Sequence, residues 1–173
     1  MANPTSRPLT LAIGGGGVKS VAAAGTLAVL EAAGLSIGPV AGVSGGGVVA
    51  LLYGYGFTPQ QIREIFEDIE LVEVWEPDPE RQALFGASRI RARFAQLVGE
   101  STFADLKRPA LALAMDLHTE QVVRLDSGPL VDALTATMAI PALFRGVQRG
   151  PQLLVDAGPM SPIPLRAARE LGG

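Results

Sequence analysis

The sequence of 173 residues predicts an α/β fold with a mostly parallel central sheet covered by helices. Short apolar runs alternate along the chain with segments of helical periodicity, and this alternation is typical of parallel sheets. Two early runs end in glycine-rich loops. Hydrophobic residues make up 48 % and charged residues 18 % of the chain, which is enough for a large core. No repeat or linker divides the chain, so we expect residues 1–173 to form a single domain.

The first third of the chain predicts two units of strand, glycine loop and helix, followed by a capped helix. Gly34 ends the first helix. In "TPQQIREIFEDI", Thr58 is the predicted N-cap, Pro59 fits the first helical position and Gln61 completes a capping box. The predicted elements are a strand at 9–13, a helix at 18–33, a strand at 39–43, a helix at 48–55 and a helix from 59 onward.

The remaining chain predicts three more strands and two more helices. Residues 70–100 are the least patterned segment, although helical spacing returns at 81–98. Gly128 and Pro129 introduce a further helix, and the last strand leads directly to Asp156. The predicted elements are a helix at 81–98, strands at 109–115 and 121–125, a helix through Met138 and a strand at 153–155.

The stretch "AGVSGGGVVALL" at 41–52 identifies Ser44 as a candidate nucleophile. The pattern Gly-x-Ser-x-Gly between a strand and a helix forms a sharp turn that exposes the serine hydroxyl. Gly42 and Gly46 supply the small flanking positions that this turn needs. Gly45 and Gly47 leave the amides of the helix N-terminus uncovered, so that they can face an oxyanion. The alternative is a structural glycine turn without chemistry.

A second glycine-rich loop, "GGGGVKS" at 14–20, also joins a predicted strand to a helix. A Walker loop needs glycine directly before Lys-Ser, where this chain has Val18. The dinucleotide-binding pattern Gly-x-Gly-x-x-Gly does not fit either, because its last glycine would fall on Lys19 or on Ser20 in the two possible alignments. An oxyanion hole fits the loop, because successive glycine amides and the helix dipole converge on one negative oxygen. Lys19 either braces this loop or is a solvated lysine of the first helical turn.

A hydrolytic serine needs a base, and the sequence offers two kinds. His118 is the only histidine and lies in a predicted turn, where a solvated side chain is the simpler interpretation. A Ser–His–Asp esterase would combine it with Asp105 or Asp116. Asp156 ends a buried strand and precedes a small residue, a glycine and a proline, which can fix its carboxylate at the end of the sheet. The residues alone leave both bases open, together with a turn or cap role for Asp156.

Four segments resemble the patatin-like phospholipases in their order and spacing: "LAIGGGGVKSVAAAGTLAVLEAAG", "AGVSGGGVVALLYGYG", "DSGPLVDALTATMAIPALF" and "LLVDAGPMSPIP". The resemblance runs over residues 9–171. It implies a three-layer α/β/α fold and a Ser–Asp dyad that hydrolyses acyl esters without histidine, metal or cofactor. The site residues that it implies are Ser44 as nucleophile, Asp156 as base, Gly15, Gly16 and Gly17 as oxyanion loop, and Gly42, Gly46, Lys19 and Gly158 as supporting motif positions.

The chain departs from the usual family pattern in three places. Ser20 stands where the family usually has glycine, which predicts a stiffer exit from the glycine loop. Ala157 follows the candidate base in place of glycine, and alanine is strained there if the position needs a positive φ. Family members usually continue into another strand after "ARELGG", so we expect a chain truncated at the C-terminus with an open sheet edge.

The amino-acid composition limits the kinds of molecule that the protein is expected to bind. The net charge of −3, with both signs interspersed, gives no electrostatic footprint for nucleic acid. The absence of cysteine excludes disulfides and thiolate metal sites. Neither a secretory signal nor a membrane span is expected, because no unbroken apolar run is long enough. We therefore expect a cytoplasmic protein that acts on a lipid or acyl-ester substrate with peripheral membrane contact. A non-catalytic lipid-binding module is the alternative.

Residues 70–100 have two interpretations. Aromatic residues stand among arginines in this segment, a composition that suits a mobile rim contacting lipid. The alternative is an ordinary amphipathic helix that packs into the core. The rim would use Trp75, Phe85 and Phe94 with Arg81, Arg89, Arg91 and Arg93, whereas the core helix would bury Phe85, Ile90, Phe94 and Leu97.

Overall fold

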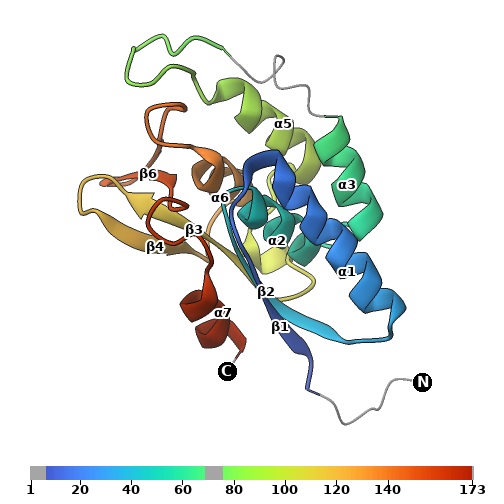
Figure 1. Cartoon of the computed structure of the whole chain (residues 1–173). Helices are drawn as coiled ribbons and strands as arrows, with labels where there is room; N and C mark the ends of the chain where they lie inside the picture. The colour runs from blue at the N-terminus through green and yellow to red at the C-terminus, as the bar shows by residue number, and fades with distance from the viewer. Residues whose placement is uncertain (1–6, 69–75, 173) are drawn as a thin grey trace.

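The computed structural model describes residues 7–68 and 76–172, which form a six-stranded sheet with helices on both faces (Figure 1). The predicted α/β class is confirmed. Strands β1, β2 and β3 pair in parallel in that order. The strands are β1 (Leu9–Ile13), β2 (Ile37–Val43), β3 (Ala110–Asp116), β4 (Gln121–Leu125), β5 (Val147–Arg149) and β6 (Gln152–Asp156).

The other strands pair in antiparallel fashion. β4 follows β3 after residues 117–120, and so short a connection permits a hairpin but not a parallel crossover. β5 and β6 form a second hairpin, and β6 pairs antiparallel with β3. The expectation of parallel strands therefore holds for the first three strands, and β4, β5 and β6 depart from it. β5, with only three residues, was not predicted from the sequence pattern.

The direction of β6 brings the carboxyl ends of two strands together. β2 ends at Val43, opposite Leu113 of β3. β6 runs toward it from the other end and finishes at Asp156, opposite Ala114. β4 pairs with both of these β3 residues, so β2 and β6 must share the other edge of β3. Ser44 and Asp156 thus lie where the two strands meet.

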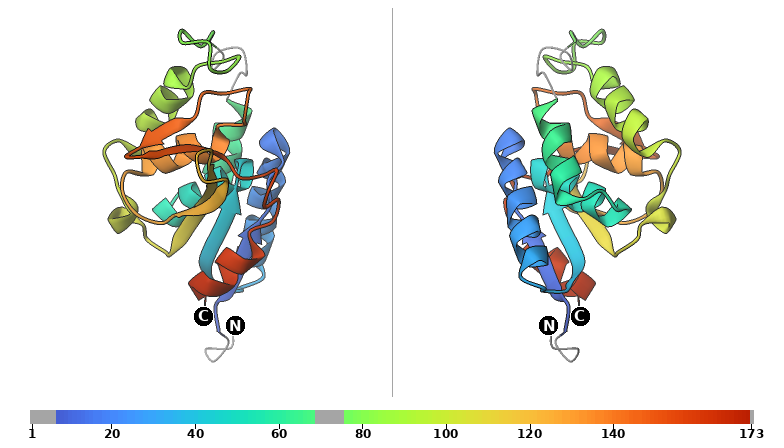
Figure 2. Two further views of the ribbon diagram at one scale, coloured as in Figure 1. Left: turned by 90° about the vertical axis from the view of Figure 1, so that its left-hand side faces the viewer. Right: turned by 90° about the vertical axis from the view of Figure 1, so that its right-hand side faces the viewer.

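The helices cover the two faces of the sheet unequally. α7 lies on one face, and the other helices lie on the opposite face, as the two side views in Figure 2 show. No helix within the described residues is long and apolar enough to cross a membrane. The helices are α1 (Ala22–Ala32), α2 (Gly45–Tyr55), α3 (Pro59–Glu67), α5 (Ser88–Val98), α6 (Leu130–Met138) and α7 (Leu165–Gly172), with 3₁₀ turns η1 (Gly17–Val21) and η2 (Phe103–Asp105).

Strand β3 separates two hydrophobic clusters by the alternation of its side chains. Its alanines face α2 and the larger cluster, whereas Leu111 and Leu113 face the smaller cluster under α7. The small residues let α2 approach the sheet closely, since a Cβ added to Gly54 would lie 2.5 Å from the Cβ of Ala110. This close packing fixes the helix that carries the candidate nucleophile at its N-terminus.

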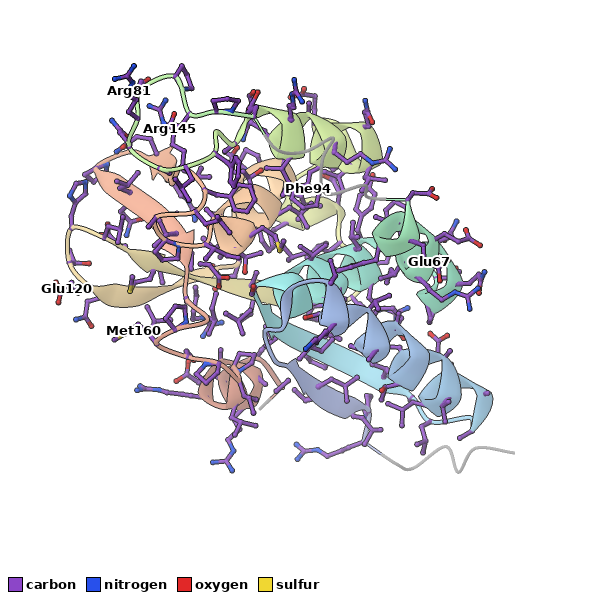
Figure 3. The ribbon with its side chains drawn as sticks, turned by 45° about the horizontal axis from the view of Figure 1, so that its top comes forward. Glu67, Arg81, Phe94, Glu120, Arg145 and Met160 are labelled. Atoms are coloured by element: carbon purple, nitrogen blue, oxygen red, sulfur yellow. The ribbon has the colours of Figure 1, made fainter. Side chains whose placement is uncertain are left out.

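The segment before α5 differs from the predicted long helix. Residues 81–87 are not helical, and α5 begins at Ser88, where the Glu76 carboxylate accepts hydrogen bonds from the first backbone N–H groups of the helix. Ile90 and Phe94 are buried, so α5 packs into the core as the second interpretation predicts (Figure 3). Phe85 is half-buried against Phe144.

Three of the four arginines of this segment contact protein groups. Arg89 pairs with Glu76, and Arg91 pairs with Asp132 of α6. Arg93 donates a hydrogen bond to Gln96. Trp75, on which the prediction of a lipid-contacting rim partly depended, lies outside the described residues.

Candidate active site

Ser44 occupies the sharp turn that its sequence pattern predicts. It follows β2 directly and is the N-cap of α2, with φ 56° and ψ −135°. A positive φ is uncommon for any residue with a side chain, and such outliers cluster at functional sites. The turn requires glycine on both sides, since a Cβ added to Gly42 would lie 2.1 Å from the Gly46 carbonyl oxygen. Ser44 is 5 % exposed.

Thr137 of α6 contacts this turn, although its sequence pattern did not identify it as a site residue. The Ser44 N–H donates to the Thr137 hydroxyl at 2.9 Å, and that hydroxyl donates to the Leu113 carbonyl at 2.8 Å. Thr137 is fully buried, so both bonds are made in a dry environment. The local signal was a threonine on a mostly apolar helix, which does not reveal a partner 93 residues away.

The Ser44 side chain interacts with the Asp156 carboxyl, at the point where β2 and β6 meet. The carboxylate also accepts a hydrogen bond from the Gly158 N–H at 2.7 Å. Burial raises the pKa of Asp156 above its ordinary value, and the hydrogen bonds from Ser44 and Gly158 oppose this rise without cancelling it. The residue is 4 % exposed. A buried carboxylate with a raised pKa is a better proton acceptor than a solvated one.

Ala157, which replaces the glycine usual in the family, fits its position without strain. It does not have a positive φ in the structure, and it is fully buried in the cluster under α7. The condition under which alanine would be strained is therefore not met.

The glycine loop lies directly against Ser44. A Cβ added to Gly15 would approach the Ser44 Cβ to 3.2 Å, so a side chain at this position would crowd the turn. The Gly15 N–H donates to the Pro162 carbonyl at 3.0 Å. The Gly16 carbonyl accepts from the Lys19 N–H at 3.1 Å, and Gly17 has φ 56°. The Lys19 side chain is exposed, while its backbone closes the loop.

A cavity of about 510 Å³ lies beside the glycine loop, between β1 and α1. Leu11, Ile13 and Leu27 supply apolar walls, and Lys19 and Ser20 line it near the loop. Ser44 and Asp156 do not line this cavity. The Ser20 hydroxyl is buried and has no hydrogen-bond partner among the described residues.

His118 is not brought to Ser44. It lies exposed in the turn between β3 and β4, where its backbone N–H donates to Asp116. The Asp116 carboxylate also accepts hydrogen bonds from the Thr119 hydroxyl and the Leu153 N–H, and Asp105 caps η2. Over residues 7–68 and 76–172, no three carboxylate, histidine or cysteine side chains gather as a possible metal site.

The comparison with family models matches residues 11–169 to the patatin-like phospholipases. The chain belongs to this family. The match includes the glycine loop, Ser44 and Asp156, and it supports a lipid hydrolase as the coarse functional class. The resemblance seen in the sequence motifs is thereby confirmed at the level of the family.

Curated relatives are distant and uncharacterized. An NTE family protein of Mycobacterium tuberculosis is 27 % identical over 163 residues, which cover 93 % of this chain and 45 % of that protein. The protein YqhO of Bacillus subtilis is 27 % identical over 184 residues, covering 87 % of this chain and 63 % of YqhO. The chain thus spans about half the length of the mycobacterial relatives that it matches.

Solved structures share the fold at low identity. VipD of Legionella pneumophila matches with a TM-score of 0.63 at 13 % identity, over 91 % of this chain and 46 % of VipD. ExoU of Pseudomonas aeruginosa, in its complex with SpcU, matches with a TM-score of 0.57 at 17 % identity, over 77 % of this chain and 39 % of ExoU. These likenesses show a common fold.

Proposed function

We propose that the protein is a serine acyl-ester hydrolase that releases fatty acids from lipid esters with a Ser44–Asp156 dyad. The observation that carries the proposal is the meeting of the ends of β2 and β6, which brings Ser44, on its strained turn, to the buried Asp156. Membership of the patatin-like phospholipase family supplies the substrate class.

In the proposed reaction, the Ser44 Oγ attacks the ester carbonyl carbon while Asp156 accepts the hydroxyl proton. The tetrahedral intermediate then collapses, and Asp156 returns the proton to the leaving alcohol, which gives an acyl-enzyme. Water attacks this second ester and passes its proton to Asp156. Release of the fatty acid restores the Ser44 hydroxyl, so the cycle needs no cofactor.

The oxyanion is assigned to the amides of Gly16 and Gly17. The Gly15 N–H donates to Pro162, so Gly15 contributes by its close approach to Ser44 rather than as a donor. The amides of Gly45 and Gly46 at the α2 N-terminus lie next to the same turn, and Ser44 makes no side-chain cap to them. Each well-placed donor contributes about 3–4 kcal/mol to transition-state stabilisation.

Labelling with a fluorophosphonate, followed by peptide mapping, tests the nucleophile. The wild type should be labelled at Ser44, and Ser44→Ala should lose labelling and at least about 1,000-fold of its short-chain nitrophenyl ester turnover. Ser36→Ala is the matched control, because Ser36 is exposed and lies at the opposite end of β2. Labelling at another serine, or retained turnover in Ser44→Ala, would overturn the proposal.

Asp156→Asn tests the dyad with the same substrate. Asparagine retains the side-chain shape but cannot accept the proton, so turnover should fall nearly as far as in Ser44→Ala. The double variant should be no worse than the worse single variant, because two residues that act as one unit lose their effect together. A clearly additive loss would argue against the dyad.

A further inference from the structure

Large apolar side chains are exposed on the two loops that border the dyad. Val18 is 52 % exposed and lies within the glycine loop. Met160, Ile163 and Leu165 are 60 %, 55 % and 58 % exposed and lie between Asp156 and the first turn of α7. We call these four residues the apolar rim. Figure 3 labels Met160 on this loop, at the surface of the molecule.

Direct contacts join the rim to the site. A Cβ added to Gly14 would lie 3.5 Å from the Ile163 Cγ1, and the Pro162 carbonyl accepts the Gly15 N–H. The Met160 N–H donates to the carbonyl of Ala157, the residue after Asp156. The rim is therefore joined to the site through backbone groups, whereas its apolar side chains face solvent.

The charges on these two segments have one sign. Between residues 8 and 30 the only charged side chain is Lys19, and between 157 and 169 the charged side chains are Arg166 and Arg169. This contrasts with the whole chain, which has 17 acidic and 14 basic residues. Glu170 pairs with Arg166 and Arg124, and Glu120 lines the same groove as Met160, so acidic groups offset the basic charge on this side. No ion pair is described for Lys19 or Arg169, which supply the unpaired positive charge.

We propose that the apolar rim, flanked by these basic side chains, is the surface through which the protein docks on an anionic lipid membrane. The inference rests on the proposed function, since it names the form in which the lipid reaches the dyad. Exposed apolar side chains enter the acyl boundary of a bilayer while adjacent lysines and arginines meet anionic head groups. It also moves the lipid-contacting surface away from α5, whose aromatic residue Phe94 is buried.

Co-sedimentation with vesicles tests this surface. The protein carries Ser44→Ala so that turnover cannot alter the lipid, and the vesicles are phosphatidylcholine with or without phosphatidylglycerol. The combined change Met160→Ser and Ile163→Ser should weaken binding to the anionic vesicles by about tenfold or more. Binding of the unchanged rim should weaken at high salt and on vesicles that lack phosphatidylglycerol.

Val29→Ser with Leu35→Ser is the matched control. Both side chains are exposed, at 68 % and 45 %, but they lie at the end of α1 remote from the glycine loop. This pair should bind vesicles as the unchanged protein does. Equal loss in both pairs, or no loss in the rim pair, would overturn the proposal. The proposal would also be overturned if the Met160→Ser, Ile163→Ser variant lost self-association in solution but still bound vesicles. The apolar rim would then bind a second copy of the protein and not a membrane.

Turnover of a soluble short-chain ester separates this proposal from the proposed function. In the background with Ser44 intact, the rim pair should keep soluble-ester turnover and thermal stability while losing vesicle hydrolysis. If the wild type hydrolyses no ester at all, the proposed function fails, and the sedimentation result with Ser44→Ala still decides the docking surface.

Discussion

Ser44 and Asp156 both occupy positions that reduce the stability of the fold. The φ of 56° and ψ of −135° at Ser44 cost about 1–3 kcal/mol for a residue with a side chain. The Asp156 carboxyl is buried, and its raised pKa shows that the charged form is disfavoured there. Neither feature improves packing. Their coincidence on two side chains that meet at the ends of β2 and β6 supports a shared chemical role.

The raised pKa of Asp156 predicts that Asp156→Asn stabilises the protein at neutral pH. The folded-state pKa lies above the unfolded one, so ionisation of this carboxyl works against folding at pH values above both. Asparagine removes that penalty. The melting temperature of the variant should exceed that of the wild type at pH 7. The difference should shrink as the pH falls through the raised pKa, which thermal denaturation from pH 8 to pH 4 will show.

Asp116→Asn provides the opposite control. Burial alone would raise the pKa of Asp116, but hydrogen bonds from His118, Thr119 and Leu153 outweigh it and lower that pKa. A lowered folded-state pKa contributes stability at neutral pH that is lost as the pH falls through it. This variant should melt below the wild type at pH 7. The same sign of change in both variants would contradict our account of the two aspartates.

At the scale of elements, glycines let helix α2 pack closely against three neighbouring segments: the glycine loop, α6 and β3. A Cβ on Gly46 would lie 2.3 Å from the Gly14 carbonyl oxygen, and a Cβ on Gly47 would lie 2.6 Å from the Thr137 hydroxyl. On the β3 side, Gly54 faces Ala110. The helix can therefore hold Ser44 against the glycine loop, α6 and β3 without intervening side chains.

Gly46→Ala should destabilise the protein by about 3 kcal/mol or more, because backbone atoms cannot yield as a flexible side chain can. Urea denaturation measures the change. Gly25→Ala is the matched control, since Gly25 lies in α1 with nothing within 4 Å of an added Cβ. That change should stabilise the protein by about 1 kcal/mol. A Gly46→Ala protein as stable as the wild type would contradict the close packing.

The sequence predicted the features that follow from local pattern. The α/β class, the first parallel strands and the capping box of α3 depend on periodicity and on short-range hydrogen bonds. The turn at Ser44 was also predictable, because the spacing of Gly42 and Gly46 around the serine is typical of it. The prediction of a helix from residue 48 was late by one turn, since glycines usually disfavour helices but here satisfy close packing at the start of α2.

The features that were missed depend on contacts between distant segments. Thr137 bonds to Ser44 only because α6 lies under the turn, and the Gly15 N–H is occupied only because the loop after β6 folds over it. The direction of β6 likewise depends on β5, a strand of three residues with little pattern of its own. Such pairings are set by the assembled sheet, so local periodicity does not reveal them.

At the scale of the whole molecule, the dyad lies beside the middle of β3, whereas the polar side chains of the β3–β4 turn lie farther along that strand. Val43 pairs with Leu113, and Asp116 is three residues beyond that point. At about 3.3 Å per residue along a strand, Asp116 is about 10 Å from the level of Val43, the residue before Ser44. His118 lies farther still along the chain, in the exposed turn.

His118→Ala should therefore leave ester turnover within about twofold of the wild type, because surface changes away from a reacting group have small effects. The chain has one histidine and no cysteine, so this single change removes every imidazole that could act as a general base. Turnover should also survive EDTA, since the proposed cycle passes each proton between Ser44, Asp156, water and the leaving alcohol. Parallel measurement of thermal stability distinguishes a chemical effect from unfolding. If His118→Ala stays folded but loses turnover as Ser44→Ala does, then histidine is the base and Asp156 is not.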